Sequence, residues 1–191
     1  MEDKTVFKKV AMTYGLYMGL TSIVLAVIQY VTGIYDISGQ SGQQWISMLL
    51  GLAVTVTFVI LAFNKYKAEG DGYLNFGEGF KLSFTTIIYS ILISIVWLAL
   101  YIWVLEPDYQ DQIMQGSYDK LISQGLEEGT EGFDMAMSMT EKMTSPIFML
   151  LLTIVNGAIF GAIISLIMAA FFKNKRPEFM PPADNDVIDN E

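Results

Sequence analysis

Four long segments of this chain contain no charged residue and no histidine, and they constrain its fold more than any other feature. They cover residues 10–32, 45–63, 82–105 and 146–172. A helix rises about 1.5 Å per residue, so about 20 residues cross a hydrocarbon layer roughly 30 Å thick. The shortest segment is still sufficient. The sequence therefore predicts an all-α, polytopic integral membrane protein with a four-helix transmembrane bundle.

Composition narrows the chemistry that such a protein can perform. The 191 residues include no cysteine and no histidine, and their formal net charge is −9. Disulfides, thiolate metal sites and cysteine nucleophiles are excluded, and the commonest acid–base side chain is absent. The negative charge argues against a nucleic-acid partner. No nucleophile–base pair or metal-ligand cluster is visible, so we expect no enzyme, no cofactor and no metal centre.

Basic residues are distributed unevenly among the connecting segments. Nine of the eleven fall on one side of a four-span arrangement: Lys4, Lys8, Lys9, Lys65, Lys67, Lys81, Lys173, Lys175 and Arg176. The segment 33–44 has none, and the segment 106–145 has nine acidic residues against two lysines. By the positive-inside rule, both termini and the loop at residues 64–81 are expected in the cytoplasm.

The residues outside the apolar segments divide into a structured loop and a tail. In the extracytoplasmic loop 106–145, apolar side chains at helical spacing predict an amphipathic helix with Pro107 in its first turn. A second short helix is expected from Phe133 to Met143. These helices would lie on the bundle or at the lipid interface, or the loop would contact a partner. We expect one membrane domain at residues 1–176 and a disordered acidic cytoplasmic tail at 177–191.

Methionines alternate in the second half of this loop. If the chain were extended, Met135, Met137 and Met139 would converge on one side, and thioethers suit Cu(I). A helix would instead align Met135, Met139 and Met143 in one stripe, which would form an adaptable apolar packing face. We favour the helical interpretation.

Polar residues gather where the third apolar segment begins, in the stretch DGYLNFGEGFKLSF. Asn75 and Glu78 have the spacing of a capping box, which satisfies the exposed amides of a first helical turn. Phe76 can anchor at the headgroups and Lys81 can reach the membrane surface, while Gly77 and Gly79 permit close approach of another backbone or a bend. These are structural roles. The functional alternative is that Glu78 and Lys81 bind an ion or a polar headgroup.

Small residues recur at steps of four or seven positions within the apolar segments. Gly15 and Gly19 in the first segment and Gly157 and Gly161 in the last predict close helix contacts, because small side chains let helices approach in lipid. Similar series are Ser47, Gly51 and Thr55 in the second segment and Ser83, Ser90 and Ser94 in the third. We expect these contacts within one molecule, with homodimerisation through one stripe as the alternative.

Asn156 is the most polar residue deep in any of the four segments. It is expected to hydrogen-bond a neighbouring helix, or to lie on a transport pathway. No ionisable residue lies within the segments, which argues against a proton-coupled or charge-moving transporter.

The stretches LNFGEGFKLSF and LEPDYQDQI, followed by a helix rich in methionine and glutamate, resemble a bacterial membrane family known as domain-of-unknown-function family 4199. The similarity runs from about Val10 to Lys175. Many members have aspartate before the proline, where this chain has Glu106 followed by Pro107 and Asp108. The resemblance implies a four-span protein of a bacterial cytoplasmic membrane and no assigned activity.

These observations together favour a non-enzymatic interaction or assembly protein. Its partners would be membrane lipid and a membrane protein or a second copy of the chain. The residues of interest are then the acidic loop around Glu106 and the motif from Asn75 to Lys81. The alternative is a small carrier, channel or ion-binding membrane protein that uses Asn156 and the small-residue faces.

Overall fold

The protein is described by a computed structural model for residues 2–32 and 44–174. Its elements are α1 (Glu2–Val31), α2 (Gln44–Glu69), α3 (Phe76–Leu100), the π-helical turn η1 (Tyr101–Leu105), α4 (Tyr109–Ser123), α5 (Glu131–Thr144) and α6 (Pro146–Phe172). Among these residues, four helices are long and apolar enough to cross a membrane: α1, α2, α3 extended by η1, and α6. The predicted all-α class with four spans is confirmed. The predicted tail at 177–191 lies outside the described residues.

The first three spanning helices are longer than the charge-free segments that predicted them. α1 starts at Glu2 and α2 continues to Glu69, so both helices include lysines at one end. In α2 the Lys65 ammonium lies 3.0 Å from the Glu69 carboxylate, one helical turn later. Long basic side chains can extend from the end of a spanning helix toward water, so charge does not have to end the helix.

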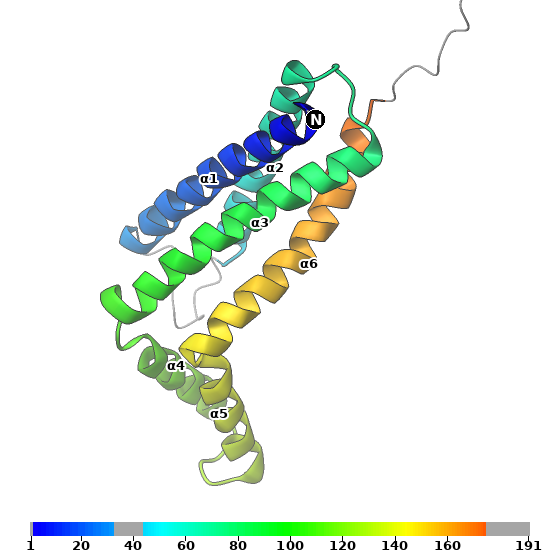
Figure 1. The fold of residues 1–191 in the computed structure, drawn as a ribbon. Helices are drawn as coiled ribbons and strands as arrows, with labels where there is room; N and C mark the ends of the chain where they lie inside the picture. Colours follow the sequence, from blue (N-terminus) through cyan, green and yellow to red (C-terminus); the bar gives the residue numbers. More distant parts are fainter. Residues whose placement is uncertain (1, 33–43, 175–191) are drawn as a thin grey trace, which may run out of the picture.

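α3 is the central helix of the molecule (Figure 1). It packs along α1 on one side and along α6 on the other, while α2 packs on α1 and makes smaller contacts with α3 and α6. Alternating side chains of α3 fill the glycine positions of its neighbours. A Cβ atom placed on Gly15 of α1 would lie 2.5 Å from the Cβ atom of Tyr89, and one on Gly161 of α6 would lie 2.8 Å from Ile87.

The predicted small-residue contacts are therefore present in the first and last spans. Gly19 and Gly157 lie equally close to side chains of α3, with Ile93 and Ile91 as their neighbours. The second span differs, because a Cβ atom on Gly51 would meet nothing within 4 Å. α2 does not use this position for a close helix contact.

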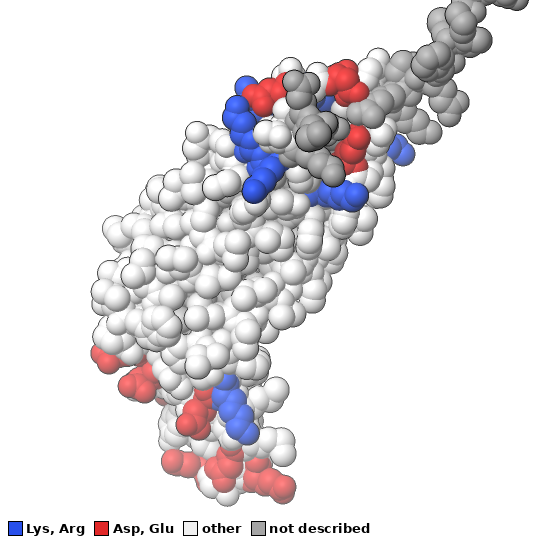
Figure 2. Space-filling model, in the orientation of Figure 1, with Lys and Arg blue, Asp and Glu red and all other residues white. Residues whose placement is uncertain are grey.

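Charged side chains are concentrated at the two ends of the molecule, with an apolar belt between them (Figure 2). We call one end the basic end; it holds the start of α1, the end of α2, the start of α3 and the end of α6. From Lys8 onward, the basic residues that the structure describes at this end are Lys8, Lys9, Lys65, Lys67, Lys81 and Lys173. The opposite end, with α4 and α5, is the acidic end.

The main core lies toward the basic end. Residues from all four spanning helices are buried together there: Val10, Ala11 and Met18 of α1, Val59, Ala62, Phe63 and Tyr66 of α2, Leu82 and Ile87 of α3, Met168 of α6, and Leu74 from the preceding loop. Backbone hydrogen bonds of 3.1 and 2.8 Å join Leu74 to Asn174, and the Lys67 ammonium donates to the Phe172 carbonyl at 3.0 Å. The 70–75 loop and the end of α6 are thus tied together.

At the acidic end, α4 and α5 form a helical pair beyond the spanning helices (Figure 1). The rings of Tyr118 and Phe133 meet edge-to-face, with centroids 5.5 Å apart. Gly125 and Gly129 adopt positive φ between the two helices, which favours glycine. The expected second helix is confirmed. The methionines at 135, 139 and 143 form the expected stripe on it, but the stripe is exposed and is not a buried packing face.

Candidate functional site

A cavity of about 670 Å³ lies at the acidic end between α1, α3, η1, α4 and α6. We call it the acidic-end cavity. Ala26 and Gln29 of α1, Trp97 of α3, and the rings of Tyr101 and Tyr109 are part of its lining. Sites for small molecules in proteins typically occupy about 300–1,000 Å³ and are lined mainly by apolar and aromatic side chains. The volume and lining of this cavity fit that description.

The end of α3 is shaped by a π-helical turn that brings aromatic rings to the cavity. The Glu106 N–H donates to the Tyr101 carbonyl five residues earlier, at 2.9 Å. A tight turn follows, in which the Tyr109 N–H donates to the Glu106 carbonyl at 3.0 Å. As a result the rings of Tyr101 and Tyr109 meet edge-to-face at 5.8 Å. Single π-helical turns are rare and are often found at functional sites.

Pro107 lies in this turn and not in the first turn of a helix, which corrects the prediction for it. The turn has proline at its second position, and Asp108 at its third position has φ −86° and ψ 11°. Both are typical of a type I turn. Asp108 is also the N-cap residue of α4, and its carbonyl accepts from the Gln112 N–H at 3.0 Å. Pro107 therefore directs the chain from α3 into α4.

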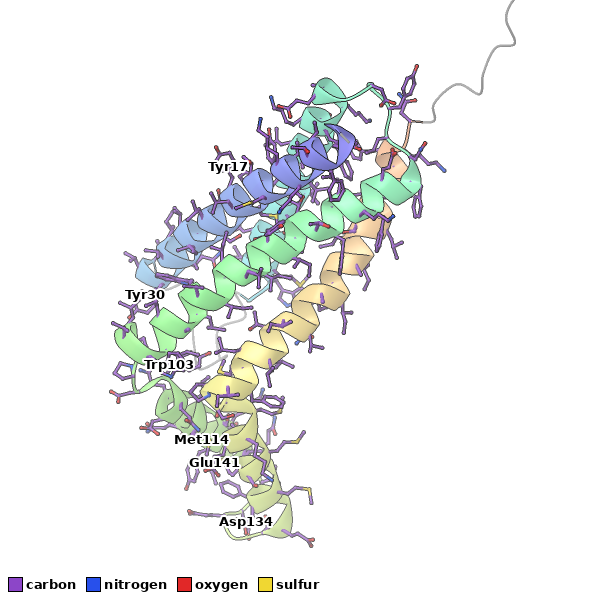
Figure 3. All side chains as sticks on the ribbon, in the orientation of Figure 1. Tyr17, Tyr30, Trp103, Met114, Asp134 and Glu141 are labelled. Carbon is purple, nitrogen blue, oxygen red and sulfur yellow. The ribbon has the colours of Figure 1, made fainter. Side chains whose placement is uncertain are left out.

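Glu106 connects three elements at the rim of the cavity. Its carboxylate accepts one hydrogen bond from the Tyr30 hydroxyl of α1 and another, at 3.2 Å, from the Gln112 side chain of α4. The Tyr30 ring also meets the Tyr101 ring edge-to-face at 5.9 Å. Figure 3 labels Tyr30 at the acidic end of α1, near Trp103 on the π-helical turn. Both oxygens of Glu106 thus hold the rim together.

The cavity surface is mainly apolar, with a few polar side chains among its lining residues. Gln29 is 6% exposed and is the most buried polar side chain of the lining. The Ser22 hydroxyl donates to the Met18 carbonyl within its own helix at 2.9 Å. In the part of the chain that the structure describes, no group of three histidine, cysteine, aspartate or glutamate residues is placed to hold a metal ion. The cavity can accept an apolar group with a polar atom near Gln29.

The Asn75 motif at the basic end forms the predicted start of α3. Asn75 is an extended N-cap residue, and the Glu78 carboxylate accepts from its backbone N–H at 2.9 Å in a capping box. Gly79, and not Gly77, makes the close helix contact: a Cβ atom on Gly79 would lie 3.4 Å from Ala169 of α6. A Cβ atom on Gly77 would meet nothing within 4 Å. The structural role of Glu78 is confirmed, and ion binding by the motif stays a prediction.

Phe76 and Lys81 are exposed at the start of α3. The contacts of these side chains to headgroups and to the membrane surface stay predictions. Neither side chain lies near the acidic-end cavity, because α3 separates the two ends of the molecule (Figure 1). The residues predicted from Asn75 to Lys81 and from Glu106 to Asp108 therefore do not form one site.

Asn156 does not form the expected hydrogen bond to a neighbouring helix. Its side chain is exposed and hydrogen-bonds no other residue of 2–32 or 44–174. The reason is its position on α6. Gly157 and Gly161 lie on the side of α6 that faces α3. Asn156 precedes Gly157 by one residue, which corresponds to a rotation of about 100° around the helix axis, so its side chain points away from this contact.

Most of the cavity was not predicted from the sequence. Gln29, Tyr30, Trp97 and Tyr101 come from two helices far apart in the chain, and no motif joins them. The available signal was the presence of a glutamine and several aromatic residues near the same ends of adjacent spans. Aromatic residues are common at membrane interfaces, so that signal alone does not distinguish a site from an anchor.

The four apolar helices, joined by charged and polar loops, define an integral membrane protein. Residues 13–174 match the model of the family described as "Protein of unknown function (DUF4199)", and the chain belongs to this family. Neither a curated protein nor a solved structure matches the chain. The match includes both the capping box and the cavity, and it confirms the resemblance found in the sequence.

Proposed function

We propose that the protein is a non-enzymatic interaction or assembly protein of the bacterial cytoplasmic membrane, and that its acidic-end cavity binds an acyl chain of a membrane lipid. The observation that supports this most strongly is the apolar, aromatic lining around Trp97 and Tyr101. An acyl chain is the apolar ligand that a membrane supplies in excess. Gln29 offers a donor and an acceptor for the ester or hydroxyl groups of the same lipid.

Charge supports an orientation with the basic end in the cytoplasm. The lysines at the basic end and the acidic residues of α4 and α5 lie on opposite sides of the apolar belt (Figure 2). Cytoplasmic loops of membrane proteins are enriched in lysine and arginine. In this orientation both termini are cytoplasmic, and the cavity receives lipid from the outer leaflet.

The packing favours a binding protein over a carrier. A carrier needs a route from one side of the membrane to the other. Phe63, Leu74 and Leu82 are fully buried in the core at the basic end, which lies in the way of such a route. The Glu106 carboxylate, which could attract a cation, instead accepts hydrogen bonds from Tyr30 and Gln112.

Tryptophan fluorescence tests lipid binding directly, because the chain has only three tryptophans. Trp45→Phe combined with Trp103→Phe leaves Trp97 in the cavity. In detergent, a lipid brominated on its acyl chain should quench Trp97 fluorescence in a saturable way, and the unlabelled lipid should reverse this. The matched control keeps Trp103, which is 60% exposed on η1, and removes the other two.

The control should show weak quenching that rises in proportion to the lipid concentration. Identical quenching curves for the two single-tryptophan proteins would contradict a lipid site in the cavity. So would quenching of Trp97 that unlabelled lipid does not reverse.

A further inference from the structure

Asn156 places a polar amide near the middle of an otherwise apolar spanning helix. α6 has 27 residues, and Asn156 lies ten residues after Pro146, or about 15 Å along the helix. The helix contains no charged residue, and the amide is exposed on its surface. Hydrocarbon offers no hydrogen-bond partner, so an amide that faces lipid pays a desolvation penalty without compensation. We therefore expect the amide to hydrogen-bond a group outside residues 2–32 and 44–174.

The residues around Asn156 repeat with the spacing of a two-helix seam. Steps of four and three residues connect Leu152, Asn156, Ile159, Ile163 and Leu166, and all five side chains are exposed. This is the alternation of apolar positions that packs two helices in a left-handed coiled coil. The seam is separate from the contact with α3, which uses Gly157 and Gly161.

A second copy of the chain fits this surface by its hydrogen-bonding chemistry. An asparagine amide has both donors and an acceptor, so two of them related by a two-fold axis satisfy each other. Two copies inserted in the same direction bring Asn156 to the same depth in the membrane. The seam carries no charge that would repel an identical seam. One asparagine in an apolar seam also fixes the register and favours a dimer.

We propose that two copies of the protein associate in parallel through α6, with Asn156 hydrogen-bonded to Asn156 of the partner subunit. The dimer goes beyond the binding of lipid in the acidic-end cavity and does not depend on it. It gives the assembly role a defined partner, a second copy of this chain.

The absence of cysteine makes the dimer testable with single cysteines. Ile159→Cys places a thiol on the seam, and Ile154→Cys places one on the opposite side of α6, at a position that is 42% exposed. In liposomes of the purified protein, oxidation should link Ile159→Cys into disulfide dimers and leave Ile154→Cys largely monomeric. Equal cross-linking at both positions would overturn the proposal, because it would report random collisions.

The role of the amide is tested in the Ile159→Cys protein by adding Asn156→Leu. The variant keeps the size and the apolar seam but removes the hydrogen bonds. Association, measured as cross-linking at increasing lipid dilution, should weaken about three- to thirtyfold, and Asn156→Gln should restore part of it. Lipid quenching of Trp97 should be unaffected, which separates this test from that of the cavity.

Two further results would overturn the proposal. One is unchanged association in Asn156→Leu, with the helix content of the protein preserved. The other is a purified protein that stays monomeric in liposomes while Ile159→Cys links to a different protein in native membranes. The second result would assign the α6 seam to another membrane protein.

Discussion

At the basic end, all four spanning helices bury side chains against one another, whereas at the acidic end two of them bury none. Residues 45–58 of α2 and 146–160 of α6 include no buried side chain, although both helices contribute to the core nearer the basic end. The acidic end has a smaller buried cluster, Tyr101, Ile102 and Tyr109, against which Met149 of α6 packs. Beside it lies the cavity, closed on one side by Glu106 and its partners. The same helices therefore pack tightly at one end and enclose a cavity at the other.

The difference between the two ends shows which contacts hold the spanning helices together. Lipid offers no hydrophobic force to bring helices together, so close packing and hydrogen bonds must do so. Here the glycines of α1 and α6 against α3, together with the Leu74–Asn174 backbone bonds, supply them. The acidic end has fewer buried side chains and keeps a cavity.

The largest expected effect tests the packed end. Phe63→Ala should lower the free energy of unfolding by about 3 kcal/mol, the low end for such a substitution, because the ring is fully buried and contacts Phe172. Denaturation by an unfolding detergent measures this. Leu92→Ala on α3 is the matched control, since that side chain is 54% exposed and should change stability by less than about 0.5 kcal/mol. Equal losses of stability in both variants would contradict the assignment of Phe63 to the packed core and of Leu92 to the surface.

The next effect tests the glycine contacts. Gly15→Ala should cost about 2 kcal/mol, because its methyl group would lie 2.5 Å from Tyr89 and 2.7 Å from the Thr86 carbonyl. Gly51→Ala should be neutral or slightly stabilising, since nothing lies within 4 Å of its Cβ position and alanine favours helix. Thermal unfolding of the two variants in detergent makes the comparison. If Gly51→Ala is the more damaging of the two, the assigned helix contacts are wrong.

The smallest effect concerns the helical pair at the acidic end. The negative charge of Glu128 and the hydrogen bond of 3.2 Å that it accepts raise the pKa of Tyr118 above its ordinary value. The neutral tyrosine is therefore favoured in the folded pair. Its contribution is present below about pH 10 and is lost as the pH rises through the raised pKa.

The measurement is the alkaline absorbance titration of tyrosine, with Tyr118→Phe subtracted from the unchanged protein. The difference curve should move toward lower pH in Glu128→Gln, because the negative charge is gone. A difference curve that does not move would show that Glu128 does not act on Tyr118 in solution.

Local patterns predicted the spans, the capping box of Asn75 and Glu78, and the helix at the methionine stripe. Each of these depends on neighbours within a few residues, so the sequence contains the necessary information. The cavity depends on which ends of α1 and α3 meet, and the side chain of Asn156 depends on which face of α6 meets α3. Both are properties of packing between distant segments. The π-helical turn at Tyr101 also has no sequence signal that we recognise.

The most direct test of the account is to identify what the protein carries when it is purified gently from its own membrane. Ala26→Phe would fill the acidic-end cavity, and Ala53→Phe would add the same ring at an exposed position on α2. Mass spectrometry should find a stoichiometric lipid on the unchanged protein and on Ala53→Phe, and little on Ala26→Phe. Equal lipid on all three, or none on the unchanged protein, would contradict the claim that the acidic-end cavity is a lipid-binding site.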